Sequence, residues 1–254
     1  MTRASRTRKS VAARARPFWI VVFLLVIALG VAAYYGAQWP GFHPRHISVR
    51  GTAVVSKGEV LRRAALDPNR NIWLQNTGGA AARVAAIPYV STVRIRRRLP
   101  AEVTILVQER KPFAIITDGT ARVLVDDQLH ILDTSIPVRA QASSAPPDLP
   151  LLRAPIPRAS VGQALRTPQL LQLARDCKAL LHASVPVAYL NLDHLGNLNA
   201  RLSSGVLVQF GDDTDIAHKA RIVNPVLSQV PQNGRRVRAL DLRAAKTPVV
   251  VFVR

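Results

Sequence analysis

The spacing of hydrophobic and polar residues changes several times along this chain, and its first clear pattern is a continuous apolar run. Residues Phe18–Ala37 carry no charge. About 20 residues in a helix match the ~30 Å hydrocarbon core of a bilayer. Aromatic residues that suit the two membrane interfaces flank the run: Trp19, Tyr34, Tyr35 and Trp39. We predict a transmembrane helix over residues 18–39 rather than a signal peptide, whose apolar region spans only about 7–15 residues.

The residues that precede this run are basic. Residues 1–17 contain no acid, and their cations are Arg3, Arg6, Arg8, Lys9, Arg14 and Arg16. So little hydrophobic material predicts disorder. The positive-inside rule keeps this tail in the cytoplasm and places the chain from about Phe42 onward outside it. The tail is also a candidate for contact with anionic lipid.

Residues 42–110 follow a strand–helix–helix–strand–strand pattern. Alternation over residues 45–50 predicts a strand, and Ser56 with Glu59 has the spacing of a helix capping box. We expect this helix to bury Val60, Leu61, Ala64 and Ala65. Asn76 or Thr77 can cap a second helix, which ends before Pro88. Two alternating runs on either side of Pro100 then predict a β-hairpin.

The remaining chain reads as a mixed sheet with two helices. A hairpin over residues 117–132 leads into a Pro-rich loop with one short strand at Leu151 and Leu152. A helix follows, with Thr167 as N-cap and a predicted buried side of Leu170, Leu171, Leu173, Ala174, Cys177, Leu180 and Leu181. Three strand-like runs come next, then a helix that Pro225 should kink or split, then two further strands.

The chain is strongly basic, with 35 Lys and Arg against 15 Asp and Glu and a net charge of +20. Such a charge raises nucleic acid as a partner. The charge is spread along the whole chain, however, and most of it belongs to the predicted exterior. Within 94–98, Arg94 and Arg96 alternate with core positions and no aromatic residue interleaves with them for base stacking. We therefore favour a solvated strand face, with lipid or a protein partner as the alternative, and expect no nucleic acid.

A search for reactive side chains yields no catalytic, cofactor or metal site. The P-loop, zinc-protease and nucleophile-elbow motifs are absent from the sequence. The single cysteine, Cys177, lies in a helical pattern and is expected to be buried. We interpret the acids Asp212, Asp213 and Asp215, near His218, as caps of a helix start. Solvation in a turn accounts for Asp126, Asp127 and His130.

Several offsets in this chain hold at once and resemble one family. The hairpin region carries Ile87, Pro88, Val90, Val93, Arg96, Leu99, Pro100, Glu109 and Pro112. This spacing is similar to that of the POTRA domain in the FtsQ/DivIB family of bacterial cell-division proteins. The next hairpin departs from the family pattern, because Gln128 or Leu129 stands where a glycine is expected. The likeness continues through Gly211, Lys219, Asp241, Leu242 and Arg243.

The resemblance implies an α+β fold in four parts. These are a basic cytoplasmic tail (1–17), a transmembrane helix (18–39), a β-α-α-β-β POTRA domain (42–111) and an FtsQ-type β domain with a mixed sheet and two helices (112–254). It identifies as family motif residues Arg96, Pro100, Glu109, Pro112, Asp241 and Arg243.

The function implied by the resemblance is that of a scaffold, not an enzyme. A bitopic protein of this family sits in the inner membrane at the division septum, binds FtsB/FtsL-type partners and helps to control septal peptidoglycan synthesis. The partner is expected to add a strand to the last strand of the β domain. The residues of that predicted site are Val249, Val250, Val251, Phe252 and Val253. The alternative is a membrane-anchored POTRA-domain chaperone or secretion adaptor.

Overall fold

The computed structural model describes residues 12–136, 149–212, 214–230 and 236–253, with side chains from residue 19 onward. Contacts within the chain divide it into two compact units. The first unit comprises Met1–Thr52, Ser56–Val84 and Val93–Val107, and the second comprises Ala53–Val55, Ala85–Thr92 and Gln108–Arg254. Each unit is described by itself below.

The first described element is the apolar helix α1 (Ala12–Ala37). Within the described part of the chain, one helix is long and apolar enough to cross a membrane, over Trp19–Ala37. The prediction of disorder before residue 18 is wrong for residues 12–17, which form the start of this helix. Extending an existing helix costs far less than nucleating one. The rest of the basic tail, residues 1–11, lies outside the described residues.

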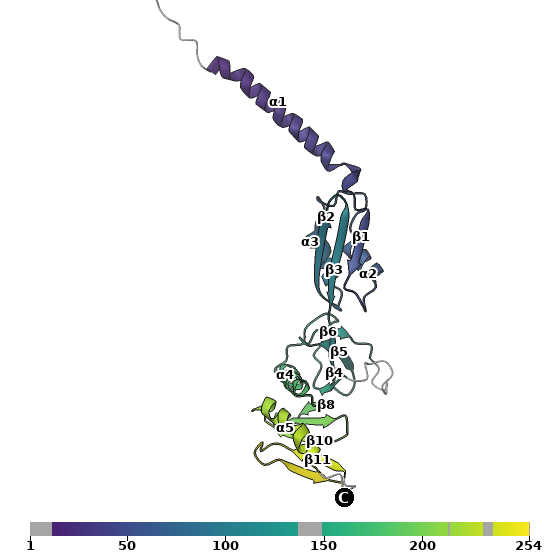
Figure 1. The fold of residues 1–254 in the computed structure, drawn as a ribbon, viewed down its shortest axis with the longest axis vertical. Helices are drawn as coiled ribbons and strands as arrows, with labels where there is room; N and C mark the ends of the chain where they lie inside the picture. Colours follow the sequence, from purple (N-terminus) through teal and green to yellow (C-terminus); the bar gives the residue numbers. More distant parts are fainter. Residues whose placement is uncertain (1–11, 137–148, 213, 231–235, 254) are drawn as a thin grey trace, which may run out of the picture. The chain divides into compact units, whose positions relative to one another are not determined.

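Strands β1 (His46–Arg50), β2 (Val90–Arg98) and β3 (Glu102–Glu109) form a sheet in the order β1-β3-β2 (Figure 1). Strand β1 runs parallel to β3, because the helices α2 (Lys57–Ala64) and α3 (Thr77–Ala85) carry the chain back before β2. The predicted β-α-α-β-β order is therefore confirmed.

The two short helices begin at polar caps. The Ser56 side chain accepts a hydrogen bond from the Glu59 N–H, and Asn76, rather than Thr77, accepts one from the Gly79 N–H. Helix α2 then ends at Ala65, whose φ of 46° is left-handed. The expected apolar stripe is only half right, because Leu61 and Ala65 are exposed while Val60 and Ala64 are buried.

In the second unit, nine described strands form one sheet in the order β12-β11-β10-β9-β8-β7-β4-β5-β6. The pairs β4–β5, β5–β6, β8–β9, β9–β10 and β11–β12 are antiparallel, whereas β4–β7, β7–β8 and β10–β11 are parallel. The strands are β4 (Pro112–Thr117), β5 (Arg122–Asp126), β6 (Ile131–Asp133), β7 (Leu151–Arg153), β8 (Val187–Leu192), β9 (Leu198–Leu202), β10 (Leu207–Gly211), β11 (Val237–Asp241) and β12 (Val249–Phe252).

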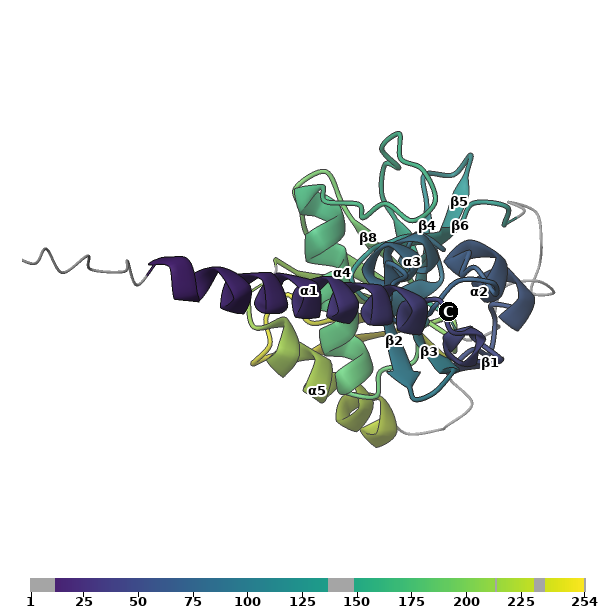
Figure 2. The same ribbon diagram turned by 90° about the horizontal axis from the view of Figure 1, so that it is seen from above.

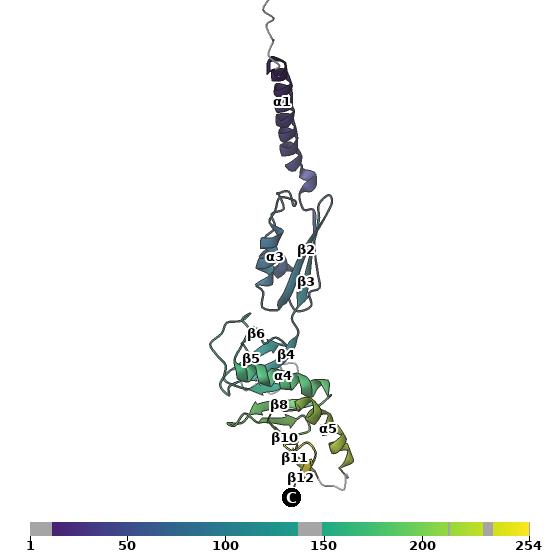
Figure 3. The ribbon, with the colours of Figure 1, turned by 90° about the vertical axis from the view of Figure 1, so that its left-hand side faces the viewer.

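Helices α4 (Pro168–His182) and α5 (Ile216–Gln229) lie side by side on one face of this sheet (Figures 2 and 3). The predicted N-cap is confirmed, since the Thr167 hydroxyl accepts a hydrogen bond from the Leu170 N–H. The predicted buried side of α4 was too broad. Leu171 and Leu181 are exposed, whereas the acidic Asp176 is buried.

The start of helix α5 differs from the sequence interpretation. Asp215 takes the N-cap position with a left-handed φ of 56°, and its side chain makes no capping hydrogen bond. Asp212 instead accepts a hydrogen bond from Lys219, 3.1 Å away, and Asp213 lies outside the described residues. Pro225 does not split the helix, which continues from Ile216 to Gln229.

The turn between β5 and β6 corrects a second interpretation. Asp126 is not solvated but 2% exposed, and its carboxylate accepts hydrogen bonds from the Arg110 guanidinium and the His130 N–H, each at 2.7 Å. Burial raises the pKa of Asp126, but these donors outweigh it and hold that pKa below its usual value. Leu129, one of the two residues at which a glycine was expected, adopts a left-handed φ of 62°.

Candidate partner-binding edge

Strand β12 stands at one end of the strand order of the larger sheet, so one of its long sides has no neighbour among the described strands. Its other side pairs antiparallel with β11, with Val249 opposite Asp241 and Val251 opposite Ala239. An edge strand of this kind offers backbone hydrogen-bonding groups to any extended segment that approaches it.

The side chains of this edge alternate as a strand requires. Val249, Val251 and Val253 are exposed, whereas Val250 is half-buried and packs against the core. The exposed valines thus give the edge an apolar face. An apolar edge that water alone covers is a site of unwanted association.

The backbone groups of the edge alternate as well. The Val253 N–H donates to the Arg236 carbonyl at 2.9 Å. Because an antiparallel strand directs alternate residues toward and away from its neighbour, Val249 and Val251 also face β11, and Val250 and Phe252 face outward. The sequence suggested a row of unpaired groups over the whole of Val249–Val253. The register restricts the outward groups to Val250 and Phe252.

Two residues of the predicted family motif, Asp241 and Arg243, lie beside this edge and pair with each other. The Arg243 guanidinium donates to the Asp241 carboxylate at 2.7 Å. This hydrogen bond lowers the pKa of the Asp241 carboxyl and outweighs the opposing effect of burial. The Leu242 N–H between them donates to the Gln209 carbonyl of β10 at 2.8 Å. These residues therefore close the end of β11 against β10, which is a structural role.

The same corner of the sheet contains Gly211 and Lys219, two further positions of the family resemblance. Gly211 has a left-handed φ of 76°, and a Cβ atom there would lie 3.1 Å from Cγ of Arg243. Lys219 is only 4% exposed, and its ammonium donates to the Phe210 carbonyl at 2.7 Å and to the Asp212 carboxylate. A buried cation held in this way ties helix α5 to the end of β10.

Comparison with known proteins matches both parts of the chain to one family. Residues 42–110 match the model of the POTRA domain, FtsQ-type, and residues 114–243 match the model of the C-terminal region of cell division protein FtsQ/DivIB. The chain belongs to the FtsQ/DivIB family of cell-division proteins. The fold and family inferred from the sequence are thereby confirmed.

Individual relatives carry the same family name. The chain is 26% identical to cell division protein FtsQ of Streptomyces venezuelae over 229 residues. This alignment covers 89% of this chain and 79% of that protein. It is 34% identical over 95 residues to FtsQ of Mycolicibacterium smegmatis, covering 37% of this chain and 28% of that protein. Among solved structures, the chain is similar to the major extracytoplasmic domain of DivIB from Geobacillus stearothermophilus, at 14% identity and a TM-score of 0.26. The superposition covers 49% of this chain and 90% of the DivIB chain.

The POTRA motif residues of this FtsQ/DivIB chain lie in structural positions. Glu109 accepts hydrogen bonds from the N–H groups of Val54 and Val55. Burial raises the pKa of Glu109, but these N–H donors outweigh burial, so the pKa lies below its usual value. Arg96 is exposed on β2, Pro100 lies in the β2–β3 turn and Pro112 opens β4. The motif residues are therefore distributed along the fold and do not form one site.

The aromatic residues predicted to anchor the helix are all exposed: Trp19, Tyr34, Tyr35 and Trp39. A helix that presents aromatic and aliphatic side chains outward on all sides needs an apolar surrounding. Together with the family, this exposed apolar helix supports membrane anchoring of the chain.

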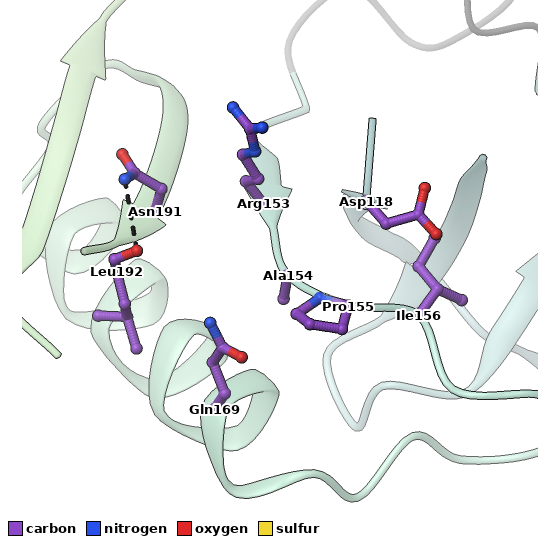
Figure 4. A pocket seen from close by; sticks show the side chains of 8 residues that line it. All are labelled: Asp118, Arg153, Ala154, Pro155, Ile156, Gln169, Asn191 and Leu192. Carbon is purple, nitrogen blue, oxygen red and sulfur yellow. Dashed lines mark hydrogen bonds between the residues drawn. The ribbon is translucent and has the colours of Figure 1, made fainter. Parts of the chain in front are cut away.

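The second unit contains a hollow of about 490 Å³. Figure 4 shows the side chains that line it. Its polar side chains, Arg153, Gln169 and Asn191, come from β7, α4 and β8. The nearby Asp118 carboxylate is engaged in its own turn, where it accepts hydrogen bonds from Thr120 and Ala121. Among the side chains drawn in Figure 4, Asp118 and Arg153 do not point toward each other.

The sequence interpretation missed the Arg110–Asp126 pair. Asp126 was interpreted as a solvated turn residue, and Arg110, which follows the motif residue Glu109, was assigned no role. A usable signal was the departure from the family turn, because a non-glycine residue in a left-handed turn needs side-chain support. Asp126 gives that support by accepting hydrogen bonds from the Gln128 and His130 N–H groups.

Proposed function

We propose that this chain is a membrane scaffold of the bacterial division machinery that binds FtsB/FtsL-type partners through strand β12. The observation that carries the proposal is the open edge of β12, an apolar strand end in a chain that belongs to a cell-division family. Through such contacts the scaffold would link early and late division proteins and help to control septal peptidoglycan synthesis.

The mechanism we infer is strand addition. An extended segment of the partner pairs with the outward backbone groups of Val250 and Phe252 and extends the sheet by one strand. Its side chains cover the exposed valines at positions 249, 251 and 253. Backbone pairing supplies affinity, and contacts with the apolar face supply specificity.

Membrane topology follows from the charges near helix α1. Because the residues before the helix are basic, we propose that the N-terminus is cytoplasmic and that both compact units lie outside the cytoplasm, at the septum. The same tail is proposed to contact anionic lipid headgroups. With both units outside the cytoplasm, nucleic acid is not an expected partner.

We infer a binding role rather than catalysis because the reactive groups of the described residues have structural tasks. Cys177 is fully buried, and burial raises the pKa of its thiol to about 12. Such a thiol is a poor nucleophile. Asp126 and Lys219 are each occupied by hydrogen bonds within the fold.

A charge at Val251 tests the edge. Val251 faces β11 with its backbone, so a proline there would damage the sheet itself, whereas Val251→Glu and Val251→Lys change only the exposed side chain. The matched control is Val161, which is 41% exposed against 44% for Val251. In affinity purification of the full chain from membranes, both Val251 variants should recover at least 10-fold less FtsB/FtsL-type partner than Val161→Glu and Val161→Lys.

Val251→Glu and Val251→Lys introduce opposite charges. If both variants lose the partner, the loss is not caused by electrostatic attraction or repulsion between the new charge and the partner. Protection of Cys177 from a thiol reagent reports whether the second unit stays folded, since this thiol lies in its core. Undiminished partner recovery with both Val251 variants would refute β12 as the binding site.

A further inference from the structure

One hydrogen bond joins the first unit to the end of helix α1, and two more hold the segment that follows this helix against the same end of the unit. The Asn71 side-chain amide donates to the Ala37 carbonyl at 2.7 Å, and the Ile72 N–H donates to the Phe42 carbonyl at 3.1 Å. The Arg45 N–H donates to the Ala101 carbonyl of the β2–β3 turn at 3.1 Å. The candidate span ends at Ala37. Both the loop around Asn71 and the β2–β3 turn therefore lie near the end of this candidate span.

Large apolar side chains at this end face away from the protein. Leu99 in the β2–β3 turn is 67% exposed, and Leu74 in the loop is 59% exposed. Trp73 and Trp39 are exposed as well. Tryptophan favours the headgroup level of a bilayer, and aliphatic residues beside it can enter the boundary with the acyl chains.

Arginines join and surround these residues. The Arg97 guanidinium donates to the carbonyls of Ile72 and Trp73, each at 3.3 Å, and lies 5.2 Å from the centre of the Trp73 ring. Arg97 therefore holds two segments together: the β2–β3 turn, which contains Leu99, and the loop that contains Leu74. The outward cations here are Arg45, Arg70 and Arg98, and the outward acids are Asp67 and Glu102.

We propose that this juxtamembrane face, defined as Trp39, Arg70, Trp73, Leu74, Arg98 and Leu99, rests on the surface of the membrane that holds helix α1. Leu74 and Leu99 enter the interface, and Arg70 and Arg98 meet the phosphate groups of anionic lipids. This inference goes beyond the partner-binding function and does not depend on it. Contact with the surface would fix the orientation of the first unit over the bilayer.

The membrane is the occupant that this position favours. Because the chain is anchored within a few residues of the face, the lipid surface is always present at a high effective concentration, and a weak contact suffices. The excess of arginine over acid suits an anionic surface, and the electrostatic attraction acts only within about one Debye length. A second copy of the chain or another protein has no comparable tether to this face.

The experiment places a fluorescent probe on the face in the full chain. Leu99→Cys, and separately Leu74→Cys, is labelled with an environment-sensitive fluorophore after reconstitution into nanodiscs with one chain each. The native Cys177 does not compete, because it is fully buried and its thiol has a pKa of about 12. Arg50→Cys serves as the control, since Arg50 is exposed at the opposite end of β1, roughly 13 Å along the strand from His46.

We expect the probes at positions 74 and 99 to be at least 3-fold less accessible to a neutral aqueous quencher than the probe at position 50. Protection should be greater in nanodiscs that contain phosphatidylglycerol than in phosphatidylcholine alone. In the anionic nanodiscs, Arg70→Glu with Arg98→Glu should remove most of it. Arg50→Glu with Arg94→Glu reverses the same number of exposed charges at the far end of β1 and the middle of β2, and should leave the protection unchanged.

Equal accessibility at positions 74, 99 and 50 would overturn the proposal. So would protection that Arg70→Glu with Arg98→Glu leaves intact. Protection that arises only in nanodiscs holding two chains would assign the face to a second copy instead. Protection that arises only after a membrane extract is added would assign it to another protein.

Discussion

The buried carboxylate of Asp126 offers a sharp test of how the second unit is held together. In Asp126→Asn the side chain keeps its size but loses its charge. The oxygen that faces Arg110 at 2.7 Å is Oδ2, whereas Oδ1 accepts the N–H groups of Gln128 and His130. An asparagine that keeps its carbonyl oxygen on these N–H groups must turn its own amide donor toward the guanidinium.

The magnitude follows from burial. Removing one partner of a buried ion pair costs about 3–5 kcal/mol, because the other charge stays buried without compensation. The Arg110 side chain is 17% exposed, so water can replace part of what it loses. We therefore expect a loss near the lower limit, about 3 kcal/mol of unfolding free energy. This corresponds to a roughly 100-fold larger population of the open state.

Cys177 is a native reporter of that population. It lies in the core of the second unit, whereas Trp19, Trp39 and Trp73 all belong to the first, so tryptophan fluorescence would report on the wrong unit. The rate at which a thiol reagent modifies Cys177 should rise about 100-fold in Asp126→Asn. The control is Asp127→Asn, since the neighbouring Asp127 is largely exposed and its exposed ion pair contributes little.

Acid provides a second measurement of the same carboxylate. The pKa of Asp126 in the folded chain lies below its ordinary value of 3.8. Its stabilising effect is therefore complete above pH 3.8 and is lost as the pH falls through the folded pKa. The ratio of Cys177 modification rates between the variant and the wild type should shrink toward one over this range. If Cys177 in Asp126→Asn is modified at neutral pH at a rate within twofold of the wild-type rate, the reasoning is refuted.

Two further substitutions test the sheet. Lys219→Met removes the donor to the Phe210 carbonyl and should cost about 1–3 kcal/mol, read from Cys177 modification; no change would mean that the buried ammonium is not stabilising. Leu152→Ala, at a fully buried position in β7, should cost about 2–5 kcal/mol by chemical denaturation, against less than about 0.5 kcal/mol for the exposed Leu195→Ala. Equal losses in the two leucine variants would contradict the assigned core.

Regular alternation and polar caps were the features that sequence could predict. The order of elements in both units follows from them, and so do the caps at Ser56 and Thr167. The helix faces were predicted too broadly, because periodicity marks a stripe but not its width. Leu61 and Leu171 fall within the pattern and yet are exposed.

Charged residues were harder to place than hydrophobic ones. A hydrophobic pattern is repeated along an element, whereas a buried ion pair joins residues from separate elements and leaves no periodic trace. Asp126 was therefore interpreted as solvated, and its partner Arg110 was not recognised. The edge strand was recognised as a strand, but the choice between inward and outward backbone groups depends on its register with β11, which the sequence does not encode locally.

The short strand β7 has a consequence for the nascent chain. Leu151–Arg153 pairs with β4 on one side and with β8 on the other, so three residues join the two halves of the larger sheet. At roughly 5–20 residues per second, ribosomes need a few seconds to pass from β4 to the end of β7. During that interval β4 presents an unpaired strand edge to the cytosol or the translocation machinery. The yield of folded protein should therefore depend on how fast this stretch is translated.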